Sequence, residues 1–475
     1  MSAQKAIVAG VAPPVPTAVL AVLVGVIVFA ASIFGIFTRP VGLLAAFWPA
    51  NALLLGLLLR HPRLAHPLGW ACAAAGYVAA DMIAGSTWPK TLLLTFGNMA
   101  GVAVGYALYR GRSADDRSLR RPEAVLILIG IALAASAAVG LVGIVANPTL
   151  FGGSPREGFE FWFVTELVNY IAVLPAVLSF PPLRSLTRRR RRTDFDFGRT
   201  WQAAPAVALL ASFALSNTVA GPGSLAFPVP ALLWCALSYG VFTTALLTLL
   251  SSVWILLSIS NGFLNLGADF HEPDMLMSLR MGVALISLGP IAVASIGEAR
   301  NALLARLECL ATHDSLTGIL NRGGFLAQSS AALAAQAPDA PVTLLMLDID
   351  RFKRINDTHG HPVGDRTLIA FTLATRSCLR DGDLFGRLGG EEFAILLTGC
   401  GRDTAEAIAE RICRTFAATA IPVPDGTVLN ATVSIGATFS AAAQSRFEDL
   451  LAQADAALYR AKQAGRNRVE AAAAG

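Results

Sequence analysis

The sequence predicts a two-part protein, a polytopic helical membrane half followed by a soluble α/β (α+β) domain. The 475-residue chain is 55% hydrophobic with a mean hydropathy of +0.59, which is too apolar for one soluble domain. Residues 17–297 form a series of apolar runs of membrane-spanning length. Beyond residue 298 the chain has the charge density of a soluble domain, and helix patterns alternate with strand patterns.

The N-terminal segment is predicted to stay in the membrane, because its first apolar run is longer than a signal-peptide core and lacks a clear cleavage site. Ten spans are predicted and eight are the alternative, since residues 200–268 carry no charge that would separate helices. An even number is required if the C-terminal domain is cytoplasmic. The approximate spans are 17–38, 41–59, 67–85, 91–109, 124–146, 160–182, 202–220, 224–240, 241–260 and 280–298.

The orientation follows from arginines, which cluster after the second, fourth and sixth spans and include the run 188–192. The positive-inside rule then places these loops, the N-terminus and the C-terminal domain in the cytoplasm. The net charge of +5 comes largely from these loops. The run could also be an anionic-lipid or nucleic-acid patch, but between two spans we interpret it as a topology signal and predict no nucleic-acid partner. Six cysteines without CxxC spacing predict neither a disulfide framework nor a zinc site.

Two acids, Asp81 and Glu166, lie inside predicted spans, where a charge is costly. Asn98 and Asn169 are their predicted partners. These acids could line a ligand or proton site, or a protonated acid could serve helix packing.

The junction at 298–313 is predicted to be a helix that continues the last span. Its leucines at 303, 304, 307 and 310 are near heptad spacing. This pattern is typical of a parallel coiled coil between two chains, and equally of a helical linker packed on one protomer.

The soluble half is predicted to alternate strands and helices around one hairpin. The predicted elements are a strand at 341–350, a short helix and loop at 351–360, a helix at 365–379, a hairpin at 386–397, a helix at 405–418, a strand at 429–439, a helix at 447–465 and a strand at 466–470.

Two acids end the first of these strands. Asp348 and Asp350 lie two residues apart, so both point to one face while Ile349 points into the core. Such acids could bind Mg²⁺, which prefers carboxylate and carbonyl oxygens together with water and substrate phosphate. They could instead cap the helix that starts near Phe352.

The hairpin carries a second pair of acids. Gly389 and Gly390 are predicted to form a two-residue turn of a primed type, with Glu391 and Glu392 beside it. If the hairpin pairs next to the Asp348 strand, carboxylates reach one metal pair from both sides, as in phosphoryl or nucleotidyl transfer. By itself, the pattern is also that of a solvated turn.

Several motifs occur together in a recognisable order. They are DSLTGILNR (314–322), DIDRFKRIND (348–357), GHPVGD (360–365), RDGD (380–383), GGEEF (389–393), SIG (434–436) and ALYRAKQAGRNRV (457–469). The soluble half therefore resembles the GGDEF family of diguanylate cyclases, in the GGEEF variant that the family accepts. The membrane half resembles, less specifically, a membrane-associated sensor domain of the MASE type, first class. The segments FWPANALLLGLLLR (47–60) and NMAGVAVGYALYR (98–110) carry that second resemblance.

The resemblance implies the architecture and the reaction. The expected domains are a membrane sensor at 1–297, a signalling helix at 298–313 and a palm-like nucleotidyl-cyclase domain at 314–475, with a central antiparallel sheet flanked by helices. The implied reaction condenses two GTP into cyclic di-GMP with release of two pyrophosphates. It needs a homodimer, formed through the GGDEF domains and the junction helix, and two Mg²⁺ or Mn²⁺ ions per site. A multi-pass protein of the bacterial inner membrane is implied.

The family also implies roles for individual residues. Asp348, the Ile349 carbonyl and Glu391 would bind metal; Glu391 would accept the proton, and Glu392 belongs to the same acidic pair. Lys353 would stabilise transition-state charge. The implied substrate-binding residues are Asn356, His361, Asp365, Lys462 and Arg466.

A product-binding site is implied by RxxD, formed by Arg380 and Asp383, with Arg411 as a possible second guanidinium. Without the family, RxxD is a surface ion pair. The alternative function is a catalytically silent module that binds cyclic di-GMP or GTP as an effector. A transporter or channel with a regulatory domain is the third class, although the spans show no clear inverted repeat.

Overall fold

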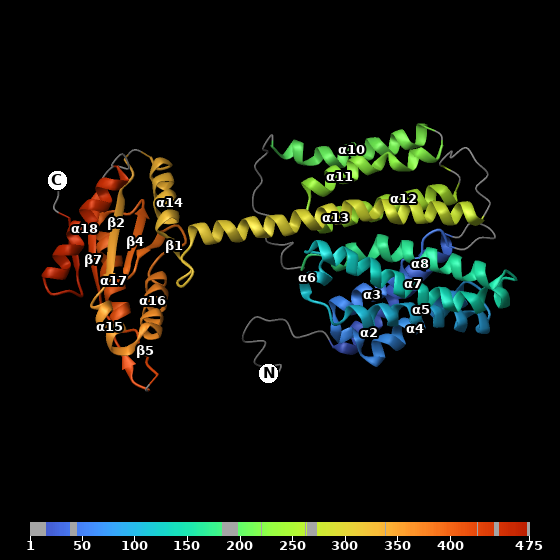
Figure 1. The fold of residues 1–475 in the computed structure, drawn as a ribbon, viewed down its shortest axis with the longest axis horizontal. Coiled ribbons are helices and arrows are strands. Elements are labelled where there is room, and N and C mark those ends of the chain that lie inside the picture. The colour runs from blue at the N-terminus through green and yellow to red at the C-terminus, as the bar shows by residue number, and fades with distance from the viewer. Residues whose placement is uncertain are drawn as a thin grey trace. The chain divides into compact units, whose positions relative to one another are not determined.

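The fold is described from a computed structural model (Figure 1). It describes the chain except for residues 1–15, 39–44, 183–197, 220, 262, 264–272, 338, 425, 441–445 and 473–475. The chain divides into two compact units, Met1–Ala302 and Leu303–Gly475. The arginine run 188–192, on which part of the predicted orientation rests, lies outside the described residues.

The first unit is helical throughout its described residues. A helix occupies each of the ten predicted span ranges, and short turns connect several of them. The elements are α2 (Thr17–Phe37), α3 (Ala50–Arg60), η1 (Pro62–Ala65), α4 (Pro67–Ile83), α5 (Trp88–Tyr109), α6 (Ala114–Arg117), α7 (Pro122–Leu150), α8 (Pro155–Leu178), α10 (Gly198–Thr218), η2 (Pro222–Ala226), α11 (Pro228–Ser238), α12 (Val241–Ser260) and α13 (Pro273–Thr312).

Six helices of the described chain are long and apolar enough to cross a membrane: α2, α5, α7, α8, α12 and the α13 segment that starts at Met275. This supports a multi-pass membrane protein. The count of ten crossings stays a prediction, because α3 and the Pro222–Ser238 segment are apolar but shorter. Helix α3 begins at Ala50, later than the predicted span. Pro49 directly precedes it, and proline favours a helix start since it has no N–H to donate.

Helix α8 is the most enclosed of the six, with 67% of its apolar window buried. It packs against α3, α7 and α12, so residues on nearly all sides of it lie inside the unit. A helix surrounded in this way can carry polar side chains away from lipid, which is where Glu166 and Asn169 lie.

Helix α13 is one continuous helix of 40 residues. It combines the last predicted span with the predicted junction helix. The four junction leucines are exposed, with Leu303 at 58% and Leu310 at 60%. Leu304 and Leu307 are likewise about half exposed, so the row presents apolar surface to solvent.

The second unit is built on a six-stranded sheet of order β1-β3-β4-β2-β7-β8 (Figure 1). Its strands are β1 (Leu320–Asn321), β2 (Val342–Ile349), β3 (Leu384–Gly389), β4 (Glu392–Thr398), β7 (Val433–Ser440) and β8 (Val469–Ala471); β5 (Ile421–Pro422) and β6 (Val428–Leu429) pair separately. The four central strands are antiparallel, as predicted, while β1 and β8 pair in parallel at the edges.

Helices cover both faces of this sheet, which accounts for the burial of every residue of the mainly apolar strand β2. They are α14 (Arg322–Ala334), α15 (Phe352–His359), α16 (His361–Arg376), α17 (Arg402–Ala417) and α18 (Phe447–Gln463). Helix α18 comes very close to β7 at Gly436, where a Cβ would lie 2.1 Å from the Leu458 nitrogen. The glycine of the SIG motif therefore sets the position of α18, and with it Lys462. The predicted fold class is confirmed.

Candidate functional site

Strand register brings the predicted acids together at one end of β2. Asp348 lies opposite Glu392 on β4 and opposite Ser434 on β7. The Ile349 N–H donates a hydrogen bond to the Glu391 carbonyl at 3.3 Å. The hairpin thus pairs next to the Asp348 strand, which is the condition on which the sequence argument depended.

Lys462 lies directly against this acidic group. Its Nζ is 2.7 Å from Asp348 Oδ2, and the Asp348 side chain is 10% exposed. Burial raises the pKa of Asp348 to about 6; Lys462 lowers it, while Glu391 and Glu392 add to the increase. Asp348, Glu391 and Glu392 thus bring negative charge together beside Lys462.

The turn lies one residue further along than predicted. Gly389 is the last residue of β3 and pairs with Glu392, so Gly390 and Glu391 form the turn. Gly390 has a φ of +49°, whereas Gly389 does not have a positive φ. The difference arises from a register irregularity between Arg387 and Gly389, which shifts the hairpin. A Cβ built on either glycine would meet no atom within 4 Å, so the space over the turn is open.

Asp350 does not cap a helix. Its Oδ1 accepts from Ser434 Oγ at 2.6 Å, and its Oδ2 accepts from Thr432 Oγ1 at 2.7 Å and from the Asn467 N–H at 3.0 Å. Helix α15 starts at Phe352, as predicted, but Arg351 is its N-cap and no side chain caps it. Asp350 therefore ties β2 to β7 and to the loop after α18.

Sequence reasoning missed Arg387, which holds the turn. Its Nε and Nη2 donate to the Gly390 carbonyl at 2.9 and 2.7 Å, and its Nη1 contacts both carboxylate oxygens of Asp314 at 3.2 Å. The available signal was an arginine two residues before Gly389, on the same side of the strand. Its partner lies 73 residues away, which no local pattern indicates.

Asp314 gives a pH prediction. Burial raises its pKa, but two hydrogen bonds from Thr317 and the Arg387 guanidinium outweigh burial, so the pKa is lowered. A lowered carboxyl pKa stabilises the fold above the ordinary value of about 3.9, and this stability is lost as pH falls through the folded-state value. We expect Asp314→Asn to lower the melting temperature at pH 7 and to flatten the acid-side decline.

The measurement is thermal unfolding of fragment 298–475 and its variant between about pH 7 and 3. Asp339→Asn is the matched control, because Asp339 is exposed and forms no ion pair among the described residues. Stability curves that run parallel for wild type and Asp314→Asn would contradict the lowered pKa of Asp314 in the folded state.

Three of the five predicted substrate-binding residues, Asn356, His361 and Asp365, lie on α15 and α16, and so does Lys353, which was predicted to stabilise transition-state charge. Lys353, His361 and Asp365 are exposed, whereas Asn356 is half-buried. The Oδ1 atom of Asn356 is buried and has no hydrogen-bond partner. A hydrogen-bond donor from a ligand would satisfy it.

Arg466 is placed separately. It follows α18 with a φ of +67° and lines a cavity together with Arg351 and Arg354. No contact joins it to Asp348 or Lys462 in the described structure.

The RxxD residues share one cavity of about 420 Å³. Arg380 Nε donates to Asp383 Oδ1 at 2.9 Å, and its guanidinium also donates to the Thr398 carbonyl. Arg411 lines the same cavity and donates to the Cys378 carbonyl at 2.7 Å. The structure thus brings together the three residues that the sequence grouped, on a surface away from Asp348.

The donor set at the end of β2 fits a magnesium ion. Two carboxylates and a backbone carbonyl leave room for the water and phosphate oxygens that Mg²⁺ takes as its other ligands. Within the described residues no three His, Cys, Asp or Glu side chains form a metal cluster. Two carboxylates and a carbonyl do not amount to such a cluster, and the observation that favours a cation there is the strand register, which puts Asp348 opposite Glu392 and beside the turn that carries Glu391.

Comparisons with known proteins support the family resemblance of both halves. Residues 311–468 match the family model "Diguanylate cyclase, GGDEF domain", and residues 19–298 match the MASE1 model. "Probable diguanylate cyclase DgcF" of Escherichia coli O157:H7 is 29% identical over 436 residues, 90% of each chain. DgcF of Escherichia coli K12 is 32% identical over 313 residues, covering 65% of this chain and 95% of that one. The solved coiled coil and GGDEF domain of DgcB from Caulobacter crescentus, in complex with c-di-GMP, is 29% identical, with a TM-score of 0.35, covering 37% of this chain and 93% of that chain.

Proposed function

Because the chain belongs to the GGDEF diguanylate cyclases that carry an N-terminal MASE1 membrane domain, we propose that it condenses two GTP molecules into cyclic di-GMP. In each half-reaction the 3′-oxygen of one GTP attacks the α-phosphorus of the other. The P–O bond to the β-phosphate breaks, pyrophosphate leaves with the bonding electrons, and the hydroxyl proton passes to a base. Two half-reactions close the ring and release two pyrophosphates.

The observation that carries this proposal is the convergence of Asp348, Glu391 and Lys462 at one end of β2. Glu391 follows Gly390 in an open turn, where a reacting hydroxyl can approach its carboxylate, so it is the proposed proton acceptor. Glu392 adds negative charge beside it. Lys462 and Arg466 provide cations for the outer phosphates, and Lys353 provides one for transition-state charge.

Divalent metal belongs to this site. Asp348, the Ile349 carbonyl and Glu391 would hold Mg²⁺ or Mn²⁺, two ions per active site. Such ions neutralise phosphate charge during in-line displacement. The chain's own contribution is to fix these oxygens, through the β2–β4 register and the Arg387 contacts with the turn.

Recognition of guanine is assigned to α15 and α16. The unpartnered Oδ1 of Asn356 accepts a hydrogen bond from the base, and Asp365 accepts another from a ring or exocyclic N–H. His361, at the start of α16, lies on the same segment. Adenine lacks the paired N–H donors of guanine, which explains a preference for GTP.

The reaction requires two GTP-loaded domains to face each other. The exposed leucine row of α13, at positions 303, 304, 307 and 310, supports a parallel coiled coil between two chains. A linker packed on its own protomer would bury these leucines, whereas they are exposed. We therefore propose a homodimer in the bacterial inner membrane, with the N-terminus and the cyclase domain cytoplasmic.

The RxxD cavity is proposed as a product-inhibition site. Arg380 and Arg411 would bind the phosphates of cyclic di-GMP, because guanidinium groups form paired charge-assisted hydrogen bonds with phosphate. We expect Arg380→Ala to raise the cyclic di-GMP concentration for half-inhibition by about tenfold or more, since one hydrogen bond to a charged group is lost. Initial rates against added cyclic di-GMP measure this.

Arg414→Ala is the control for that variant. Arg414 is an exposed arginine on α17 that lines neither of the two cavities to which Arg380 contributes. Unchanged inhibition in Arg380→Ala would remove the regulatory role.

The experiment that tests the function uses the full chain in lipid nanodiscs with GTP and Mg²⁺, and separates nucleotides by chromatography. We expect cyclic di-GMP and pyrophosphate in a ratio of about one to two, from the stoichiometry of two phosphoryl transfers. Binding of cyclic di-GMP without any synthesis would favour the silent effector module instead.

A further inference from the structure

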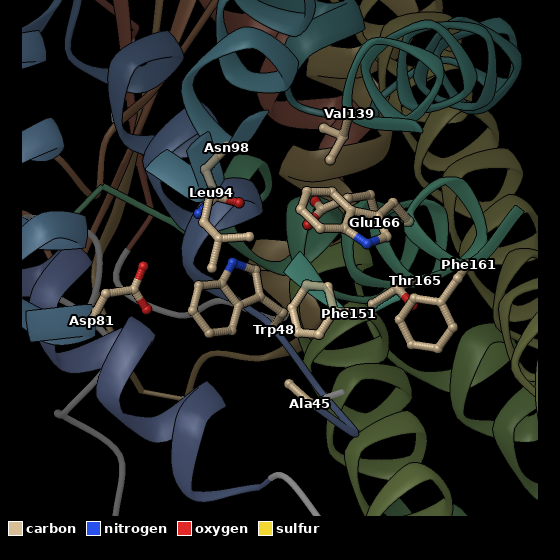
Figure 2. A pocket seen from close by; sticks show the side chains of 11 residues that line it. Ala45, Trp48, Asp81, Leu94, Asn98, Val139, Phe151, Phe161, Thr165 and Glu166 are labelled. Atoms are coloured by element: carbon tan, nitrogen blue, oxygen red, sulfur yellow. The ribbon is translucent and has the colours of Figure 1, made fainter. Parts of the chain in front are cut away.

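A small cavity of about 80 Å³ lies inside the membrane unit. Its walls come from the segment before α3 and from α4, α5, α7 and α8, and its polar lining includes Asp81, Asn98, Thr165 and Glu166. Figure 2 shows the Trp48 indole near the centre of the view, with Asp81 to its left and Thr165 and Phe161 to its right. One water needs about 10–15 Å³ on a comparable measure, so the cavity holds a small ligand.

Two of the buried polar atoms in this wall, one on Glu166 and one on Trp162, have no hydrogen-bond partner. Glu166 is 5% exposed and its Oε2 makes no hydrogen bond, and Trp162 is 9% exposed and its Nε1 makes none. Glu166 Oε2 requires a hydrogen-bond donor or a cation, and Trp162 Nε1 requires a hydrogen-bond acceptor. An unsatisfied carboxylate oxygen at membrane depth is costly, so both groups point to a ligand that has a donor and an acceptor.

The nearest buried cation is engaged elsewhere. Arg280 on α13 is 3% exposed, donates from Nη1 to Thr165 Oγ1 at 2.8 Å and from Nη2 to the Ala45 carbonyl at 3.0 Å, and lies over the Phe161 ring. Among the described ion pairs, none involves Glu166. Among the described basic residues, none therefore provides a positive group for Glu166.

The predicted asparagine partners are also engaged. Asn169 accepts from the Trp48 N–H at 3.0 Å and donates to the Thr165 carbonyl at 2.8 Å, while Asn98 accepts from the Asn51 amide at 3.1 Å. These bonds stiffen the wall around Glu166 without satisfying Oε2. The simple helix-packing explanation therefore leaves the acid incomplete.

We propose that this cavity is a binding site for a small primary amine that carries an oxygen acceptor a few atoms away, such as an amino alcohol or a small amino acid. The ammonium group binds the Glu166 carboxylate among the aromatic rings of the wall, which favour cations. The ligand oxygen accepts a hydrogen bond from Trp162 Nε1. We infer an amine because the Glu166 carboxylate and the aromatic rings of the wall both attract a cation. We infer an oxygen acceptor because the Trp162 indole N–H needs one.

The occupied cavity acts on α13, and this step rests on the proposed cyclase function. Arg280 joins α13 to two residues of the cavity wall, Ala45 and Thr165. Further along α13, Ser295 Oγ donates to the Leu119 and Arg121 carbonyls at 2.8 and 2.9 Å. A ligand that shifts Thr165 therefore changes the Arg280 contact that holds α13, and α13 continues into the junction helix.

The binding test uses the full chain in nanodiscs of phosphatidylglycerol and isothermal titration with ethanolamine, 3-aminopropanol and glycine. At least one should bind, with propylamine weaker because it lacks the acceptor, and ethylene glycol should not bind. Glu166→Gln should weaken the binding at least tenfold. Glu160→Gln is the matched control, since Glu160 lies on the same helix in an exposed pair with Arg156.

A second variant guards against misfolding. Trp162→Phe keeps a ring but removes the donor, so it should abolish the preference for ethanolamine over propylamine. The site is refuted if no amine of the panel binds, or if Glu166→Gln binds as tightly as wild type.

The coupling is tested separately. Arg280→Lys, at a residue that does not line the cavity, should still bind the amine but lose its effect on the rate of cyclic di-GMP synthesis, because the paired contacts to Thr165 and Ala45 are lost. An amine that binds wild type without changing that rate refutes the coupling alone. A chain that binds amine but makes no cyclic di-GMP refutes the proposed function and leaves the site standing.

Discussion

Glu391→Gln is expected to lower the rate of cyclic di-GMP synthesis by about 10³-fold, within the range of about 10² to 10⁴ for loss of a general base. The amide keeps the shape of the side chain but can neither accept the proton nor offer a charged oxygen to a metal. The fold should not change, because the Glu391 contact with β2 uses its backbone carbonyl. Steady-state synthesis and thermal unfolding of fragment 298–475 measure both effects.

Two matched variants sharpen this result. Glu410→Gln changes an exposed acid on α17 and should leave the rate unaltered. Glu392→Gln changes the neighbour that lies opposite Asp348, and comparison with Glu391→Gln assigns the roles within the acidic pair. A Glu391→Gln rate within tenfold of wild type would exclude this carboxylate as the base.

Lys462→Met is expected to lower the rate by about 10²-fold, because the proposed charge-assisted contact to phosphate and the 2.7 Å contact to Asp348 are both lost. Lys462 lowers the pKa of Asp348, which is already about 6, so its removal lets that pKa rise. The acid side of the pH–rate profile should therefore move to higher pH. A stopped-time assay between about pH 5 and 9 measures the shift.

The control for this variant is Arg414→Met, which removes an exposed cation from α17. It should change neither the rate nor the profile. A Lys462→Met enzyme that is slower at all pH values by the same factor would mean that the lysine acts on phosphate alone and not through Asp348.

The hairpin illustrates the limit of local reasoning. Two glycines followed by two glutamates predicted a turn with acids beside it, and such a turn exists. Its register is shifted by one residue, because an irregularity in β3 and two hydrogen bonds from Arg387 to the Gly390 carbonyl fix the turn. Turn propensity predicts the approximate position of a glycine turn in the sequence. Strand pairing and long-range contacts then determine which of two neighbouring registers forms.

In the membrane half, too, the sequence predicted the local elements but not their contacts. Apolar runs predicted helices in all ten ranges, and helices occupy them, because length and hydropathy are properties of each segment alone. The partners of the buried polar groups could not be predicted in this way. Asn169 bonds to Trp48, and Arg280 bonds across 235 residues of sequence to Ala45.

The sequence by itself determined the two-part fold, the order of motifs and the residue types that phosphoryl transfer needs, since these depend on periodicity and on side-chain chemistry. Only the tertiary structure decided that Asp350 ties β2 to β7 rather than capping α15. Its hydrogen-bond partners Thr432 and Ser434 lie 82 and 84 residues away and reach it only because β2 and β7 pair in one register. A carboxylate has the same chemistry in either role, and the physical difference is which donors the fold brings within hydrogen-bond distance.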